Sequence, residues 1–194
     1  MPFPLATRRL ILRPFTDADL EPFLAYRNHP EVHRYQGWKT PYQREMAEEF
    51  IRSMQAAEPG REGQWFQAAL ELKSTHELIG DVGFAPREGS HGQAHLGVTL
   101  ARPFWNKGYA VEGITAILDF IFDELSLHRV HADCDTENRG SIRLLERLGF
   151  RREAHHVKSY WLGDRWGDEY VYAILEHEWK VRAGQSVTDL FNGG

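Results

Sequence analysis

The sequence predicts an α/β domain in which helices cover both faces of a mixed β-sheet. The middle of the chain holds three β-type segments, two of them separated by a short polar turn, which is typical of antiparallel hairpins. Later strand patterns alternate with helices, and such crossovers place strands parallel to one another. Together the two arrangements imply a mixed sheet with helices on either side.

The first third of the chain is expected to hold one strand and two helices. Residues 8–14 carry an apolar run that stops at a proline, which predicts a strand. Thr16 with an acidic residue three places later, Asp19, is typical of a helix N-terminus. A second helix is expected to open at Thr40-Pro41, with threonine as the cap and proline in the first helical position, and to reach about Ala57.

The rest of the chain alternates strands and helices. A helix over 108–125 has apolar residues three and four positions apart, which predicts one buried stripe. A helix over 139–148 is expected to end at Gly149, because glycine readily adopts the left-handed conformation that follows a last turn. We expect one domain, 1–194, whose polar residues from about 180 form a frayed tail. The strands are expected at 65–72, 78–84, 93–100, 129–134, 153–162 and 168–175.

Composition excludes several classes of protein. No apolar run approaches the roughly 18 residues of a membrane span, and the N-terminus does not resemble a signal peptide, so we expect a cytoplasmic protein without membrane contact. Cys134 is the only cysteine, which excludes an internal disulfide and a multi-cysteine zinc site. The net charge of −5 opposes nucleic-acid binding. The histidines follow no metal-binding motif, so no metal is expected.

The segment from Val98 to Glu112 carries the first functional signal. A strand enters a loop containing Asn106, Lys107 and Gly108, and the loop opens directly into a long amphipathic helix. The amides of a helix's first turn lack internal partners, and the helix dipole places partial positive charge there. Because glycine also lets a ligand approach the backbone closely, the arrangement favours an anion, above all a phosphate. The alternative is an ordinary strand-to-helix loop with a solvated lysine.

A second signal lies further along the chain, at Asn138 and Ser141. Residues three apart lie on one face of a helix, so these two side chains are expected to point the same way where the later helix begins. The structural alternative is that Asn138 caps the helix and Ser141 fills its first turn.

Both segments, in this order, resemble the GNAT N-acetyltransferase superfamily, and within it the RimJ/RimL-like branch of ribosomal-protein alanine acetyltransferases. The resemblance extends over nearly the whole chain, through TRRLILRPFTDADL, ELIGDVGF, the 98–112 segment, ENRGSIRLLERLGF and DEYVYAILEHEW. It implies the acyl-CoA N-acyltransferase fold, a mixed sheet splayed open at its centre, where acetyl-CoA inserts as co-substrate.

The resemblance assigns the acetyl-CoA contacts residue by residue. The family loop is written Q/R-x-x-G-x-G/A; Gly108 and Ala110 match its last positions, and Trp105 stands where Gln or Arg is usual. One common side-chain contact is therefore absent, and backbone amides are expected to hold the pyrophosphate. The resemblance implies cofactor contacts at Val98, Thr99, Leu100, Trp105, Asn106, Lys107, Gly108, Tyr109 and Ala110, with Asn138 and Ser141 beside the pantetheine and the sulfur.

The resemblance further implies direct transfer of an acetyl group to a primary amine, with a protein or peptide N-terminus as the first candidate acceptor. Attack of the neutral amine forms a tetrahedral intermediate, which a backbone N–H near Leu100 is expected to stabilise. Ser141 is the candidate donor to the leaving sulfur, and Asn138 is expected to fix the pantetheine. Glu112 is a candidate base, with helix-dipole complementarity as its alternative. Further candidate bases are Asp81, Glu137, Tyr160 and a water chain.

The same residues are also compatible with other acceptors and with a noncatalytic function. The acceptor could be a small-molecule amine such as a polyamine, an amino-acid-like compound or an aminoglycoside. A noncatalytic acyl-CoA-binding module would also fit the fold, and the resemblance allows a homodimer. The aromatic candidates for the wall of an acceptor pocket are Tyr35, Trp38, Tyr42, Trp161 and Trp166.

Overall fold

The computed structural model describes residues 3–163 and 165–184, without the side chains of the last two. The strands of this part form one sheet in the order β1-β2-β3-β4-β5-β6-β8-β7. The strands are β1 (Leu5–Ala6), β2 (Leu10–Arg13), β3 (Phe66–Leu72), β4 (Glu77–Pro86), β5 (Gln93–Leu100), β6 (Arg129–Asp135), β7 (Arg151–Trp161) and β8 (Trp166–Leu175). The helices are α1 (Leu20–Arg27), α2 (Pro30–His33), α3 (Arg44–Gln55), α4 (Tyr109–Asp119), α5 (Arg139–Leu148) and α6 (Glu176–Gly184).

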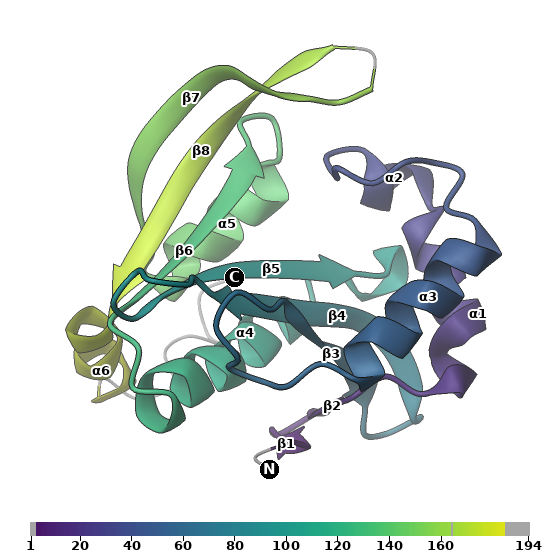
Figure 1. The fold of residues 1–194 in the computed structure, drawn as a ribbon, viewed down its shortest axis with the longest axis horizontal. Helices are drawn as coiled ribbons and strands as arrows, with labels where there is room; N and C mark the ends of the chain where they lie inside the picture. The colour runs from purple at the N-terminus through teal and green to yellow at the C-terminus, as the bar shows by residue number, and fades with distance from the viewer. Residues whose placement is uncertain (1–2, 164, 185–194) are drawn as a thin grey trace.

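The sheet is mixed, as predicted, and opens at its centre. Every described pair of neighbouring strands is antiparallel except β5 and β6, which run parallel. These two strands pair only over Gln93–His95 and Arg129–His131, although β5 continues to Leu100 and β6 to Asp135. Beyond His95 the two strands separate, and Figure 1 shows β6 rising away from β5. We call this opening the fork.

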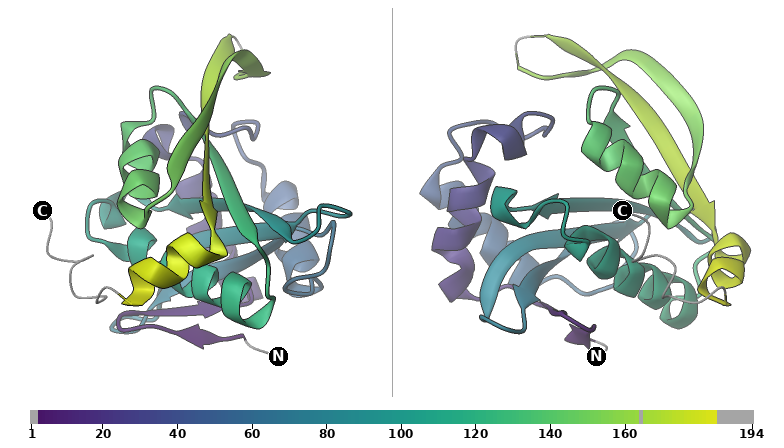
Figure 2. Two further views of the ribbon diagram at one scale, coloured as in Figure 1. Left: turned by 90° about the vertical axis from the view of Figure 1, so that its left-hand side faces the viewer. Right: turned by 180° about the vertical axis from the view of Figure 1, so that it is seen from behind.

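Helices lie on both faces of the sheet, which confirms the predicted architecture. Figures 1 and 2 show α4 and α5 on one face and α3, with α1 beside it, on the other. The first face holds the larger hydrophobic cluster, with Ile114 and Ile117 of α4 fully buried. The second face holds a smaller cluster in which α3 contributes Ala47 and Ile51. The predicted long helix is confirmed in α4, which continues into a π-helical turn ending at Glu124.

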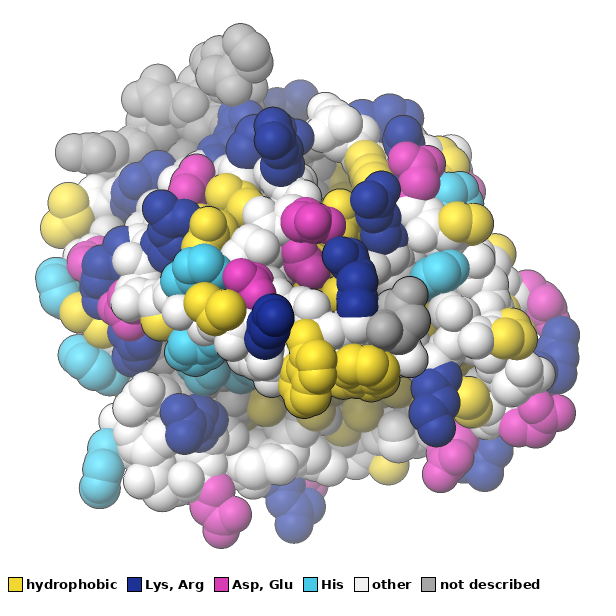
Figure 3. All heavy atoms as spheres, turned by 90° about the horizontal axis from the view of Figure 1, so that it is seen from above, with side chains coloured by type: hydrophobic (Ala, Val, Ile, Leu, Met, Phe, Trp, Pro, Cys, Tyr) yellow, Lys and Arg dark blue, Asp and Glu magenta, His cyan; other side chains and the backbone are white. Residues whose placement is uncertain are grey.

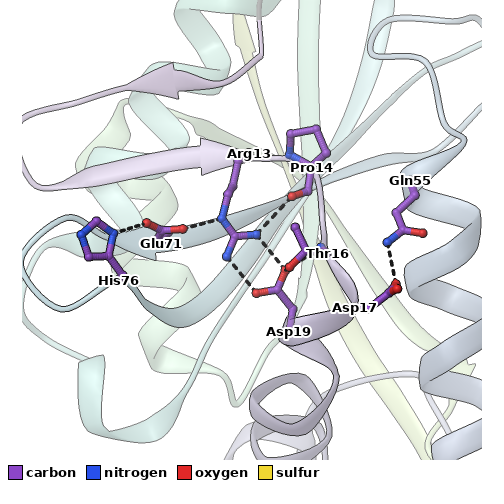
Figure 4. Close-up of polar contacts among 8 residues, drawn as sticks. All are labelled: Arg13, Pro14, Thr16, Asp17, Asp19, Gln55, Glu71 and His76. Atoms are coloured by element: carbon purple, nitrogen blue, oxygen red, sulfur yellow. Dashed lines mark hydrogen bonds and ion pairs between the residues drawn. The ribbon is translucent and has the colours of Figure 1, made fainter.

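Arg13 fixes the start of α1 to the sheet (Figure 4). Its guanidinium makes two bonds to the Asp19 carboxylate, at 2.7 and 2.8 Å, and a third to Glu71 on β3. The Asp19 carboxylate also accepts from the Thr16 amide at 2.7 Å, so the predicted capping box is present. This network ties the start of α1 to β2 and β3, and α1 in turn carries side chains of the site described below.

The start of the second helix differs from the prediction. Helix α3 begins at Arg44 with Gln43 as its cap, not at Thr40-Pro41. The reason is a pair of tertiary bonds: the Asn28 side chain accepts from the Tyr42 amide at 2.7 Å and donates to the Tyr42 carbonyl at 3.0 Å. The second bond occupies the Tyr42 carbonyl, which a helix starting at Thr40-Pro41 would offer to the amide four residues further on, and Gln43 stays extended.

The C-terminal end of the described chain is also more ordered than expected. Helix α6 continues to Gly184, so the segment predicted to fray from about residue 180 begins as helix, and 185–194 lie outside the described residues. Trp179 explains this order, because its side chain is only 3% exposed and its indole N–H donates to Asp119 of α4 at 2.8 Å.

Candidate active site

A cavity of about 400 Å³ passes through the sheet at the fork. Side chains alternate across a strand, so Ala132 and Cys134 of β6 face α4 and α5, whereas Asp133 faces the opposite side. Residues of both faces line the cavity. The α5 side contributes Asn138, Ser141, Leu144 and Leu145, and the opposite side contributes Arg27, Tyr35, Trp38, Trp65, Gln67, Asp81, His95, Thr99 and Asp133. A molecule in the cavity would therefore contact both faces of the sheet.

The loop before α4 has the geometry of an anion site. Asn106 and Gly108 both adopt left-handed backbone conformations, with φ of 58° and 78°, and Gly108 is the N-cap of α4. The first helical bond runs from the Glu112 amide to the Gly108 carbonyl, so the amides of residues 109–111 precede the helical ladder. Lys107 is exposed beside them. The donors and the charge thus fit the diphosphate of a coenzyme A ligand.

Trp105 has a structural part in this loop. Its indole N–H donates to the Leu100 carbonyl at 2.8 Å, which ties the loop to the end of β5. A tryptophan in place of the usual Gln or Arg therefore positions the backbone. Val98 and Thr99 lie on the part of β5 that has passed the pairing with β6, and both line the cavity.

Glu112 lies apart from the cavity and is fully engaged with the N-terminal segment. Its carboxylate accepts from the Thr7 hydroxyl, the Arg9 amide and Arg9 Nε, each at 2.6 Å. Burial opposes ionisation, but these donors outweigh it and hold the pKa of Glu112 below its usual value. Glu112 does not belong to the cavity lining. These contacts favour its structural alternative over the role of base.

Asn138 and Ser141 both line the cavity, and their local structure matches the capping alternative as well. The Asn138 side-chain oxygen accepts from the Ser141 amide at 3.1 Å and caps α5. Only the amide of Ser141 is used in this bond, so its hydroxyl has no part in the cap. The capping role of Asn138 and the predicted position of both side chains beside the pantetheine and the sulfur are therefore compatible.

A buried polar cluster forms the floor of the cavity on the side of α1. Asp81 is 1% exposed and accepts from the Tyr26 hydroxyl, the Gln67 amide and, at 3.3 Å, the Arg27 guanidinium. Burial raises the pKa of Asp81, although the three donors oppose the shift. Arg27 in turn stacks on Trp38 at 4.0 Å. Asp81 was a sequence candidate, but its partners lie on a helix and a strand with no motif to mark them.

Tyr160 reaches the cavity from β7 and is bound to a second buried carboxylate. Its hydroxyl donates to Asp135, which is 6% exposed and also accepts from the Glu137 amide at 2.6 Å. Burial and the nearby Asp135 raise the pKa of Tyr160 well above its usual value, so Tyr160 stays protonated. Glu137 itself is exposed and does not line the cavity.

One further pair in the cavity, His95 and Asp133, was not predicted from the sequence. His95 Nε2 lies 2.6 Å from Asp133 Oδ1, and both residues line the cavity. His95 stacks on His131 with ring centroids 4.9 Å apart, and Trp65 meets it edge-on at 5.7 Å. The two strands are far apart in sequence, so only the register of β5 against β6 brings the pair together.

Of the five aromatic candidates for a pocket wall, two line the cavity and three pack against other aromatic rings outside its lining. Tyr35 and Trp38 line the cavity, whereas Tyr42 packs edge-on against Phe23 and Trp38. Trp161 and Trp166 lie outside the lining, 53% and 57% exposed, and pack edge to face on each other at the end of the β7–β8 hairpin.

Cys134 lines the cavity, and its buried surroundings make its thiol unreactive. Burial, together with nearby carboxylates, raises the pKa of the Cys134 thiol to about 12. The thiol therefore stays protonated near neutral pH and serves as an apolar wall of the cavity. Among the described residues, no group of three or more His, Cys, Asp and Glu side chains is arranged to hold a metal ion.

Comparisons with known proteins agree with this geometry. The profile of the acetyltransferase (GNAT) domain matches residues 9–151. An uncharacterised N-acetyltransferase of Bacillus subtilis, YnaD, is 34% identical over 90% of this chain and 98% of its own. The crystal structure of a GNAT-family acetyltransferase from Bacillus anthracis aligns with a TM-score of 0.80 and 31% identity, over 89% of this chain and 98% of the other. The chain belongs to the GNAT family of N-acetyltransferases, enzymes that use acetyl-CoA.

Relatives with named acceptors differ in the amine that they acetylate. The ribosomal protein uS5-alanine N-acetyltransferase of Escherichia coli is 30% identical over 61% of this chain and 62% of its own. The spermidine N(1)-acetyltransferase of Vibrio cholerae is 29% identical over 55% of this chain and 61% of its own.

Within the described residues, no helix is both long and apolar enough to cross a membrane.

Proposed function

We propose that the protein transfers the acetyl group of acetyl-CoA to the N-terminal amine of a protein or peptide. The cavity at the fork carries this proposal, because it joins the α5 face, with Asn138 and Ser141, to the opposite face, with Asp81 and His95. Acetyl-CoA would lie on the first face and the acceptor amine would enter from the second.

Residues around the α4 N-terminus would hold the diphosphate of acetyl-CoA. The backbone amides at Asn106, Gly108, Tyr109 and Ala110 are the proposed donors, and Lys107 would add a full positive charge. The part of β5 beyond the fork, Val98 to Leu100, has no neighbouring strand on its β6 side among the described residues. We assign this free strand edge to the pantetheine arm.

The chain supplies two groups near the reacting atoms. An amine attacks only in its neutral form, and attack on the thioester places negative charge on the carbonyl oxygen, which a backbone N–H of β5 near Leu100 would stabilise. The leaving sulfur gains negative charge and would be stabilised by the Ser141 hydroxyl. Asn138 would fix the pantetheine through its side-chain amide, since its oxygen already caps α5.

The surface beside the cavity supports a peptide acceptor. Trp161 directly follows Tyr160, which lines the cavity, and Trp161 and Trp166 together leave aromatic surface exposed. Figure 3 views the molecule from above and shows hydrophobic side chains next to Lys and Arg side chains on this face. Exposed aromatic residues beside a binding site are suited to contact residues that follow an N-terminal amine.

A small cationic amine is the second candidate, favoured by the charge of the lining. Asp81, Asp133, Asp135 and Glu169 line the cavity, whereas Arg27 is its only Lys or Arg among the described residues. This excess of carboxylates attracts an acceptor with additional positive charge, such as a polyamine. It would equally attract the ammonium group of a peptide, so charge alone does not separate the two.

A thiol-release assay with acetyl-CoA tests the proposal. The acceptors are short peptides with free N-termini, the same peptides with blocked N-termini and an internal lysine, polyamines and aminoglycosides. We expect turnover with the free peptides and a mass increase at their N-termini. Turnover confined to the polyamines would select the second candidate. Calorimetric binding of CoA without turnover on any amine would overturn both and leave a noncatalytic acyl-CoA-binding module.

A further inference from the structure

We propose that His95, held in place by Asp133, is the base that takes the proton from the acceptor amine. This inference rests on the acetyl transfer proposed above and adds the residue that carries the proton.

The pair stands where an acceptor amine would meet the thioester. His95 is the last residue of β5 that pairs with β6, opposite His131, and Asp133 lies two residues further along β6 on the same face. Both side chains line the cavity on the acceptor side, next to Trp65 and on the same face as Thr99. His95 therefore stands at the base of the fork and Asp133 just beyond it.

The geometry leaves one imidazole nitrogen available. Nε2 faces Asp133 Oδ1 at 2.6 Å, and among the described residues no group bonds Nδ1. We infer that this close carboxylate holds the proton on Nε2, so that Nδ1 carries the lone pair and can accept a proton. The contact with His95 holds the pKa of Asp133 below its usual value, so the carboxylate stays charged and stabilises the imidazolium that forms. The His95 side chain is 37% exposed, which lets the proton leave to water.

The two candidate bases from the sequence that line the cavity, Asp81 and Tyr160, are already engaged with neighbours. The oxygens of Asp81 accept from Gln67 on one side and from Tyr26 and Arg27 on the other. Tyr160 keeps its proton on a bond to Asp135. His95 differs from both, because among the described residues no side chain or backbone group bonds its Nδ1 atom.

The reaction must remove one proton from an ammonium acceptor, and His95 can receive it. An ammonium acceptor loses one proton to His95 Nδ1 and becomes the neutral amine. Its nitrogen then forms the new bond to the acetyl carbon while the carbon–sulfur bond breaks, and the second nitrogen proton ends on the sulfur of free CoA. The net reaction releases one proton, which His95 passes to solvent. No oxidant, metal or further reactant is needed.

Several charged groups surround His95 and would shape its pH response. On β6 they are Asp133 and His131, and burial together with His95 lowers the pKa of His131, so that His131 is neutral in the stack. Arg87 and Arg129 act on His131 from the ends of β4 and β6. Across the cavity the charged groups are Asp81, Asp135, Glu169 and Arg27.

The kinetic test compares His95→Gln and Asp133→Asn with the wild type on the best acceptor amine. We expect His95→Gln to lower kcat by about 100-fold, the lower end of the effect of a general base, with KM for acetyl-CoA unchanged. Its kcat/KM should lose the acidic inflection of the wild-type pH profile, and the defect should narrow at high pH, where the amine is neutral without help. Asp133→Asn, which removes the positioning carboxylate, should lower kcat at least about 10-fold.

A matched pair on the surface provides the control. His155 and Asp168 form the same type of contact at 3.1 Å outside this cavity, so His155→Gln should keep the wild-type kcat and pH profile. Chemical rescue separates a basic role from a structural one: imidazole added to His95→Ala should raise kcat in proportion to its neutral form. It should leave the wild type and His155→Ala unchanged.

The outcomes separate this inference from the proposed function. If the wild type acetylates an amine but His95→Gln keeps its kcat and acidic inflection, His95 is not the base and the transfer reaction stands. A loss of kcat in His95→Ala without imidazole rescue and with an unchanged pH profile would likewise overturn the inference. If the wild type acetylates no amine, the proposed function fails first.

Discussion

Arg9 and Glu112 fasten the N-terminal segment to the first turn of α4. Arg9 Nε lies 2.6 Å from Glu112 Oε2, and Arg9 Nη1 donates to the Lys107 carbonyl at 2.9 Å. The guanidinium also lies over the Tyr109 ring at 4.3 Å. One side chain from near the N-terminus thus holds the end of the proposed diphosphate loop against the first turn of α4.

Glu112→Gln tests whether this carboxylate is structural. The glutamine amide has one oxygen and an NH2 group in place of the other, so it cannot accept all three bonds, and we expect a loss of about 2 kcal/mol in the free energy of unfolding in urea. The loop would loosen, and KM for acetyl-CoA should rise while kcat at saturation stays within a few-fold of the wild type. If Glu112→Gln kept the stability of the wild type but lost most of its kcat, Glu112 would act as the base.

The same residue predicts a pH dependence of stability. Its pKa in the folded protein is below its usual value, so the folded state favours the ionised form. The stabilisation is therefore complete above the usual glutamate range and is lost as the pH falls through the lower, folded value. Urea titrations should show the stability gap between wild type and Glu112→Gln shrinking in acid. A gap that stays constant from neutral pH to about pH 3 would contradict this.

Gly108→Ala tests the left-handed N-cap of α4. A Cβ on Gly108 would meet Arg9 Nη2 at 3.3 Å, and φ of 78° adds backbone strain of about 1–2 kcal/mol. We expect calorimetry to show weaker CoA binding, by about 10-fold or more, because the loop amides shift. Gly89→Ala is the control, since Gly89 is also left-handed, with φ of 64°, but its Cβ would meet nothing within 4 Å. Equal effects of both variants on CoA affinity would refute a specific role of Gly108.

Asn138 and Ser141 can be separated by their parts in the cap. Asn138→Ala removes the acceptor for the Ser141 amide and should lower stability by about 1 kcal/mol, whereas Asn138→Ser can still cap. Ser141→Ala keeps the capping bond, so stability should hold while kcat falls. Thermal melts and steady-state kinetics on the three variants check this. A Ser141→Ala enzyme with wild-type kcat would remove Ser141 from the proposed mechanism.

The Cys134 thiol should react slowly with thiol reagents. Since burial raises its thiol pKa to about 12, the reactive thiolate is scarce at pH 8, and we expect slow modification by an aromatic disulfide reagent. Cys134→Ser should retain kcat. Rapid modification that also abolishes turnover in the absence of CoA, together with an inactive serine variant, would point instead to a nucleophilic cysteine.

Local signals explain what could be predicted from the sequence. Helix α5 was predicted with its observed bounds because Asn138 starts it and Gly149, with φ of 89°, ends it. Strand β5 was predicted at Gln93–Leu100 because a glycine-rich loop precedes it and a proline-marked loop follows it. In these places the chain's own neighbours decide the structure.

The misses depend on contacts between distant segments. The start of α3 was set by Asn28, and α6 by the burial of Trp179 against α4. The pair His95 and Asp133 required the register of a parallel strand pair, which no local pattern encodes. The sequence predicted helix-dipole complementarity for Glu112 as one alternative, but it could not predict its partners Thr7 and Arg9, which are more than a hundred residues away.

The three residue pairs that join β5 to β6 have a mechanical consequence for the whole enzyme. The sheet has two halves, β1–β5 and β6–β8, and among the described residues their strands pair only at β5 and β6. A pantetheine chain lying along the open edge of β5 would extend this pairing and resist the spreading of the two halves. Amide hydrogen exchange at Leu96–Leu100 and Ala132–Asp135 should therefore slow when CoA binds, more than exchange in the outer strands.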